Sequence, residues 1–166
     1  RRHSVGIGLG RKRRILRVVH RLLFGRGIRL AHTAALERPC RALRRALESL
    51  RGTHDFTSFA VESKKYDDPV RSILRAELYE CGPMKCIHFI GDGFLYKMVR
   101  SMVGVLAEIG RNRLPPEIVP ELLEARNRSC ARDTAPAAGL FLMKVFYENN
   151  AWDHYQMRSL PWEFYS

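Results

Sequence analysis

The residues best placed to do chemistry lie in one short run, 93–104, which reads Gly-Phe-Leu-Tyr-Lys-Met-Val-Arg-Ser-Met-Val-Gly. In a helix its polar and small residues share one face, at positions i, i+3, i+4 and i+7: Lys97, Arg100, Ser101 and Gly104. A guanidinium on such a face can bind a phosphate or a carboxylate, and it lowers the pKa of a carboxyl group beside it. The run therefore predicts an anion contact, which either anchors a ligand or keeps a catalytic acid ionised.

A second candidate is the pair His54 and Asp55 in the run 52–59, which reads Gly-Thr-His-Asp-Phe-Thr-Ser-Phe. A histidine oriented by a carboxylate can act as a general base. No serine or cysteine is positioned as a nucleophile for it, so we expect a hydrogen-bonded loop histidine instead. The six histidines and four cysteines show no metal-ligand spacing. We therefore expect no metal site and no cofactor.

Hydrophobic periodicity and turn residues predict the elements that position these runs. An apolar stripe over 95–109 predicts a core-facing helix that Asp92 or Gly93 caps and that Gly110 ends. The run 53–59 is expected to be a loop. The other expected elements are helix 36–50 with Pro39 in its first turn, strands 71–80 and 84–91, helix 115–125 and strand 139–147.

The basic residues crowd the first part of the chain. Of 29 Lys and Arg residues 15 fall within 1–51, against 2 of the 17 Asp and Glu residues, and the whole chain carries a net charge of +12. Such an excess favours a polyanion as partner, with RNA ahead of a membrane. Residues 11–24 place apolar side chains at helical spacing, which predicts a basic amphipathic helix. That helix could dock on RNA or a ribonucleoprotein, lie against a membrane surface or a partner helix, or stay solvated.

The cysteines and the apolar runs indicate the cellular compartment in which the protein works. No C-x-x-C pair occurs among the four cysteines, so we expect free thiols in a reducing compartment. No apolar run approaches the roughly 18 residues of a membrane span, and no signal-peptide core is present. The arginine-rich, acid-free first thirty residues have the composition of a transit peptide. They predict an organelle, the mitochondrion ahead of the plastid, with the cytoplasm as the alternative.

A third run, 135–140, reads Ala-Pro-Ala-Ala-Gly-Leu. In this order and at these separations, the three runs resemble the C-terminal half of the tRNA pseudouridine synthase A family, from about Leu36 to Tyr147. The resemblance implies an α+β fold, with helices packed on one face of an antiparallel sheet. It also implies that an edge of this sheet is left exposed and pairs with another chain or with RNA.

The resemblance also assigns roles to matching residues. Arg100 corresponds to the arginine that pairs with the family's nucleophilic aspartate, Phe94 helps to wall the base pocket, and Leu140 brings strand backbone and an apolar surface to the uracil. That aspartate lies in a run like Arg-Thr-Asp-x-Gly-Val in the family's N-terminal half, and no such run occurs in this sequence. The family's base-stacking tyrosine also belongs to that half, whereas the first tyrosine here is Tyr66.

Two main functions follow. The first is a non-catalytic RNA-binding protein that serves as a structural component of a ribonucleoprotein, plausibly an organellar ribosome, in contact with other proteins of that particle. The alternative is a part of an active tRNA pseudouridine synthase whose aspartate lies in a missing segment or a partner chain. A stand-alone RNA-binding accessory factor is a third, weaker possibility.

The RNA contacts and the domain organisation complete the expectations. Residues 1–33 form a basic extension, 34–150 the pseudouridine-synthase-like domain and 151–166 an aromatic tail. Lys64 and Lys65 beside Tyr66 resemble an RNA-contact patch, although a solvated loop explains them nearly as well. The candidate RNA contacts are Arg11, Lys12, Arg13, Arg14, Arg17, Arg21, Lys64, Lys65, Lys97 and Arg100.

Overall fold

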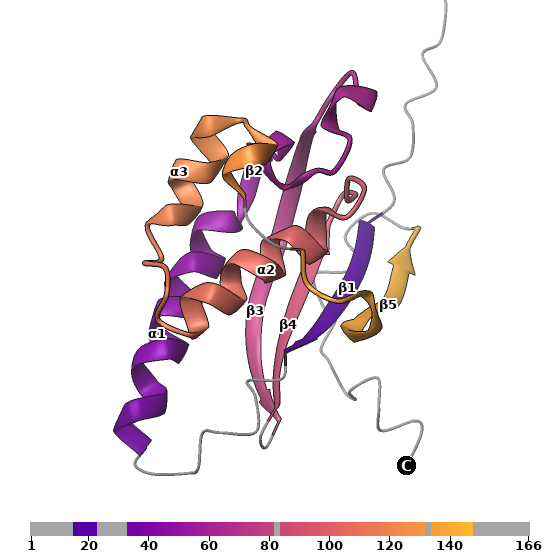
Figure 1. Ribbon diagram of the computed structural model, residues 1–166. Coiled ribbons are helices and arrows are strands. Elements are labelled where there is room, and N and C mark those ends of the chain that lie inside the picture. Colours follow the sequence, from indigo (N-terminus) through magenta and orange to yellow (C-terminus); the bar gives the residue numbers. More distant parts are fainter. Residues whose placement is uncertain (1–14, 23–32, 82–83, 132–133, 148–166) are drawn as a thin grey trace, which may run out of the picture.

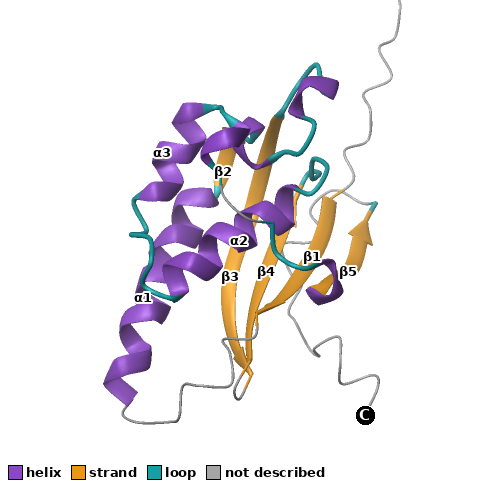
Figure 2. Cartoon of the chain, viewed as in Figure 1, coloured by secondary structure: helices purple, strands orange, loops and turns teal. Residues whose placement is uncertain are grey.

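The computed structural model describes residues 15–22, 33–81, 84–131 and 134–147. Within this part of the chain, five antiparallel strands form one sheet in the order β2-β3-β4-β1-β5, and three α-helices pack against one of its faces (Figure 1; Figure 2). This confirms the α+β class. The strands are β1 (Ile15–Leu22), β2 (Gly52–Asp55), β3 (Val70–Cys81), β4 (Met84–Gly91) and β5 (Leu140–Phe146). The helices are α1 (Thr33–Leu50), α2 (Met98–Gly110) and α3 (Ile118–Ala125).

The core lies between the sheet and the helices. Alternate residues of β4, Ile87 and Phe89, point into it and are fully buried, as the period of a strand requires. The predicted apolar stripe of α2 meets them. All seven of its residues are buried, which confirms the stripe: Leu95, Met98, Val99, Met102, Val103, Leu106 and Ile109.

Most of the predicted elements are present. The predicted strands 71–80 and 84–91 are confirmed as β3 and β4, which pair antiparallel as far as Cys81 opposite Met84, with a register shift between Ile73 and Arg75. The final strand is confirmed as β5. Helix 36–50 is confirmed but begins earlier, at Thr33, so that Pro39 lies inside α1 rather than in its first turn. The last predicted helix becomes α3, which Pro115 and Pro116 precede.

The predicted start of α2 is wrong, because the residue expected to cap the helix is hydrogen-bonded to strand β3 instead. Asp92 accepts a hydrogen bond from the Ser72 N–H at 2.8 Å and donates its own N–H to the Ser72 carbonyl at 3.1 Å. Gly91 allows this close approach, since a Cβ there would lie 2.9 Å from the same carbonyl oxygen. The chain then runs as a loop to Lys97, which precedes the first helical residue, Met98.

The amphipathic helix predicted over 11–24 is also wrong. Residues 15–22 form β1, which pairs on one side with β4 and on the other with β5 (Figure 1). Hydrogen-bonded neighbours on both sides stabilise a strand rich in Ile and Val, and this tertiary pairing outweighs the helical spacing of its apolar residues. Arg11 to Arg14 lie outside the described residues, as does the tail 151–166.

The run 53–59, expected to be a loop, contains two short elements. Gly52 to Asp55 form β2, which pairs with β3, and Thr57–Phe59 form a 3-10 helix. Gly52 has a φ of +101°, a conformation that side chains rarely adopt, and this turn lets the chain pass from α1 into the sheet. β2 is a short strand at the exposed edge of the sheet. Because its sequence is polar, hydrophobic periodicity does not predict it.

Candidate functional site

Arg100 and Ala135 bring two of the three sequence runs together. The Ala135 N–H donates to the Arg100 carbonyl at 2.9 Å, and the Arg100 Nε–H donates to the Ala135 carbonyl at 2.7 Å. The residue that begins the run 135–140 is therefore fixed to α2 by a main-chain and a side-chain hydrogen bond. From there the chain turns through a short 3-10 helix, Ala137–Gly139, into β5.

The bond through Nε also orients the guanidinium of Arg100. This side chain is partly buried, and its terminal nitrogens have no hydrogen-bond or ion-pair partner among the described residues. A guanidinium held at Nε presents its two Nη groups as a planar fork, a geometry that suits a carboxylate or a phosphate. The anion contact predicted from the sequence thus has a cation with a fixed direction.

The other members of the predicted polar face differ from Arg100. Ser101 is fully buried, and Lys97 lies just before the helix rather than within it. Phe94 and Leu140, which the resemblance places in the base pocket, are both partly buried and pack against the core. Phe94 lies in the loop before α2, and Leu140 is the first residue of β5.

Sequence reasoning missed a residue that shapes this loop. Arg128 donates hydrogen bonds from its guanidinium to the Ala131 carbonyl at 2.5 Å and to Thr134 Oγ1 at 3.2 Å. These bonds fix Ala131 and Thr134, and Thr134 directly precedes Ala135. No spacing or motif marks Arg128 in the sequence, because its partners are loop atoms that only the folded chain brings near it.

The remaining run, 52–59, makes hydrogen bonds that stabilise the fold. Asp55 accepts hydrogen bonds from the Thr57 N–H at 2.9 Å and the Thr57 hydroxyl at 2.6 Å. Ser58 Oγ accepts from the Asn127 N–H at 2.8 Å, which ties the run to the loop after α3. His54 Nε2 lies 2.7 Å from the Arg51 carbonyl, which confirms the predicted hydrogen bond, but His54 lies in β2 rather than in a loop.

Replacement of Asp55 by alanine tests this structural role. We expect the free energy of unfolding to fall by about 1–2 kcal/mol, because two local hydrogen bonds are lost. Asp55→Asn keeps an acceptor oxygen and should lose less. Chemical denaturation of the three proteins measures the difference. An Asp55→Ala protein as stable as the wild type would contradict the structural role of Asp55.

Two of the predicted RNA-contact lysines are brought near the run 93–104. The segment Ser63–Lys65, a short 3-10 helix, is joined to the loop before α2 because the Tyr96 N–H donates to the Tyr66 hydroxyl at 2.8 Å. Lys65 lies 2.5 Å from Glu62, and this hydrogen bond raises the pKa of Lys65 above its usual value. Lys64 is exposed.

The remaining candidates fall elsewhere. Arg17 and Arg21 lie in β1, opposite Ile90 and Cys86 of β4, and Arg11 to Arg14 are outside the described residues. The described part of the chain holds no group of three or more His, Cys, Asp or Glu residues that could bind a metal ion. Nor does any helix in that part have the length and apolar character needed to cross a bilayer.

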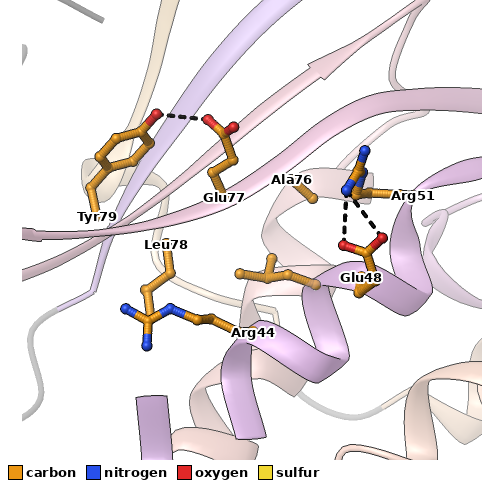
Figure 3. Close-up of a pocket in the computed structure, with 8 residues that line it drawn as sticks. Arg44, Glu48, Arg51, Ala76, Glu77, Leu78 and Tyr79 are labelled. Atoms are coloured by element: carbon orange, nitrogen blue, oxygen red, sulfur yellow. Dashed lines mark hydrogen bonds and ion pairs between the residues drawn. The ribbon is translucent and has the colours of Figure 1, made fainter. Parts of the chain in front are cut away.

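A groove between α1 and β3 is lined by none of the predicted site residues (Figure 3). Arg44 and Arg51 of α1 line it, but Glu48 and Glu77 line it too. Glu48 binds Arg51 at 2.9 Å, and Glu77 accepts a hydrogen bond from the Tyr79 hydroxyl at 2.7 Å. The positive charges of the arginines and the negative charges of the glutamates offset one another, so the groove is not suited to binding an anion.

Comparison with known proteins supports the family resemblance that the three runs carry. The family model described as tRNA pseudouridine synthase matches residues 46–148. Proteins named tRNA pseudouridine synthase A are also similar to it: that of an Exiguobacterium species is 45% identical over 118 residues, and that of Geobacillus kaustophilus is 46% identical over 113. These alignments cover 71% and 68% of this chain but only 48% and 44% of the relatives, so the chain spans about half of their length. Because the matched region holds the Arg100–Ala135 pair and all three runs, the chain belongs to the tRNA pseudouridine synthase family.

Proposed function

We propose that this chain is the part of a tRNA pseudouridine synthase that holds the active-site arginine, and that an aspartate from another segment or a partner chain completes the site. The observation that carries the proposal is Arg100, whose guanidinium is fixed through Nε and free at both terminal nitrogens among the described residues. A carboxylate beside those nitrogens would complete a bidentate pair.

The reaction explains why such a pair is needed. Pseudouridine forms when the bond between ribose and a uracil nitrogen breaks and the ring is rejoined through carbon. A carboxylate nucleophile must be ionised beside the base, and a guanidinium in contact with it lowers its pKa. Arg100 would also hold the carboxylate in one orientation. Phe94 and Leu140 would supply apolar walls for the uracil.

The proposed substrate is tRNA. Relatives that are 45% identical carry that substrate in their names, and the net charge of +12 suits a polyanion. Lys64, Lys97 and Arg100 are the predicted RNA contacts whose surroundings support this assignment. Placement in an organelle and the division at residues 33 and 150 stay predictions.

The non-catalytic role in a ribonucleoprotein has less support. The basic helix that could have docked on a ribonucleoprotein is not formed, since residues 15–22 are a strand. The names of the relatives are those of enzymes. We therefore adopt the proposal that the chain is part of an active synthase.

Deletion of the gene that encodes this chain tests the proposal. We expect specific tRNA pseudouridines to disappear when the gene is deleted and to return with the wild-type gene but not with Arg100→Met. Pseudouridine mapping by chemical modification and sequencing measures this. An unchanged tRNA map, together with sedimentation of the protein in a ribonucleoprotein at high salt, would favour the non-catalytic role.

A further inference from the structure

Tyr96 is an exposed aromatic residue on a rigid backbone. Its N–H donates to the Tyr66 hydroxyl at 2.8 Å, and its carbonyl accepts from the Val61 N–H at 3.0 Å. The backbone is thus held on both sides by a segment thirty residues earlier. The residue is nevertheless 50% exposed. A half-exposed aromatic side chain on a fixed backbone is suited to binding a flat ligand.

The next residue, Lys97, has an unusual backbone. Its φ of 57° and ψ of 8° lie in the left-handed region, which is disfavoured for a residue with a Cβ and is usually occupied by Gly or Asn. Its carbonyl accepts from the Ser101 N–H at 2.9 Å in the first turn of α2. This conformation keeps the side chains of 96 and 97 together, with Lys97 Nζ 5.0 Å from the centre of the Tyr96 ring. A lysine at a position that suits Gly points to a use for its charge.

The surroundings of the ring are basic. The short helix Ser63–Lys65 ends beside Tyr66, whose hydroxyl holds Tyr96, and Tyr96 is near enough to Lys65 to affect its pKa. Glu62 offsets the charge of Lys65, whereas Lys64 has no ionic partner among the described residues. The exposed Tyr96 ring, Lys97 with its ammonium over that ring, and Lys64 on the short helix that Tyr66 joins to the Tyr96 backbone are together named the Tyr96 patch.

We propose that the Tyr96 patch binds an unpaired nucleotide of the RNA substrate, whose base stacks on the Tyr96 ring while Lys97 and Lys64 contact its phosphates. The proposal rests on the function proposed above, and it adds a positioning site to the predicted pocket around Arg100. A ring with cations beside it matches the stacked bases and phosphates of single-stranded RNA. A protein partner would favour a ring set among apolar residues instead.

Removal of the ring is the first test. We expect Tyr96→Ala to weaken binding of the chain to a fluorescein-labelled single-stranded RNA by about fivefold to a hundredfold, measured by fluorescence anisotropy. Tyr96→Phe keeps the ring and should bind like the wild type. A duplex RNA of the same length should bind both variants equally. Equal affinity of Tyr96→Ala and wild type for the single strand would overturn the proposal, as would an equal loss on Tyr96→Phe.

Removal of the charge is the second test. Asn tolerates the left-handed region, so Lys97→Asn should leave the thermal midpoint unchanged or raise it. Its affinity for the single strand should fall, and the slope of log K against log salt should lessen by about 0.7, the value for one phosphate contact. Arg113→Asn removes a charge at the other end of α2 and should change neither quantity. An unchanged slope for Lys97→Asn would overturn the phosphate contact.

The outcomes separate this site from the proposed function. If wild-type protein binds RNA and its cells keep their tRNA pseudouridines only when the gene is present, the synthase function stands whatever the Tyr96 variants do. If those variants then bind like the wild type, the Tyr96 patch alone is refuted. If the wild-type chain binds neither tRNA nor the single strand, both proposals fail.

Discussion

Replacement of Arg100 by methionine is expected to lower pseudouridine formation by a factor of at least about 10² to 10³, which is the effect of removing one preorganised charge from an active site. The substitution keeps the length of the side chain but removes the cation that would keep the nucleophilic aspartate ionised. It also removes the bond from Nε to the Ala135 carbonyl. Loss of this charged donor should lower the free energy of unfolding by about 1.5–3 kcal/mol.

Arg100→Lys separates the two effects. Lysine restores the positive charge but cannot hold the Ala135 carbonyl and a carboxylate at once in the planar geometry of arginine. We expect kcat to recover in part, with KM for tRNA near the wild-type value. Single-turnover rates and thermal unfolding should be measured on the protein together with the segment or partner that carries the aspartate. Full activity of Arg100→Met would show that another residue pairs with the nucleophile.

Replacement of Phe59 by alanine is expected to have the largest effect on stability. The ring is fully buried, and its centre lies 6.2 Å from that of Phe56 in a tilted arrangement. The Phe59 N–H also donates to the Phe56 carbonyl at 2.9 Å. Removal of a buried ring from a packed core costs about 3–5 kcal/mol, because the cavity closes only in part. The thermal midpoint should fall by about 10 °C, given the usual slope for a chain of this size.

The control for Phe59 is an apolar residue of the sheet. Leu142 of β5 is 63% exposed, and Leu142→Ala should change the free energy of unfolding by less than about 0.5 kcal/mol. Guanidinium unfolding followed by circular dichroism compares the two variants with the wild type. A loss below about 1 kcal/mol for Phe59→Ala would mean that the run 52–59 is not packed as described.

The parts of the fold that the sequence predicted are those with a strong local pattern. The stripe on α2 has the helical period, and in the sequence Gly82 and Pro83, residue types typical of turns, separate the predicted strands 71–80 and 84–91. The position where α2 begins has no such pattern. Asp92 is a good helix cap by type, yet the backbone of Ser72 in β3 binds it, and Ser72 is twenty residues away in the chain.

The segment 11–24 shows why periodicity alone can mislead. Its apolar spacing fits a helix, and its Ile and Val residues fit a strand equally well. The two neighbouring strands, β4 and β5, decide the outcome by supplying hydrogen-bond partners on both sides. Neither neighbour is local, since β5 begins more than a hundred residues later. No window of sequence contains that information.

For the site, the sequence by itself determined which residues are present and their family. The three runs identified Arg100 as the important cation and placed Lys64, Lys65 and Lys97 among the candidate RNA contacts. Only the tertiary structure decided what these residues face: Arg100 is oriented by the Ala135 carbonyl, and Tyr96 is held by Tyr66. The physical reason is that residue types and local spacing set the available chemistry, whereas direction comes from hydrogen bonds between segments that are thirty or more residues apart.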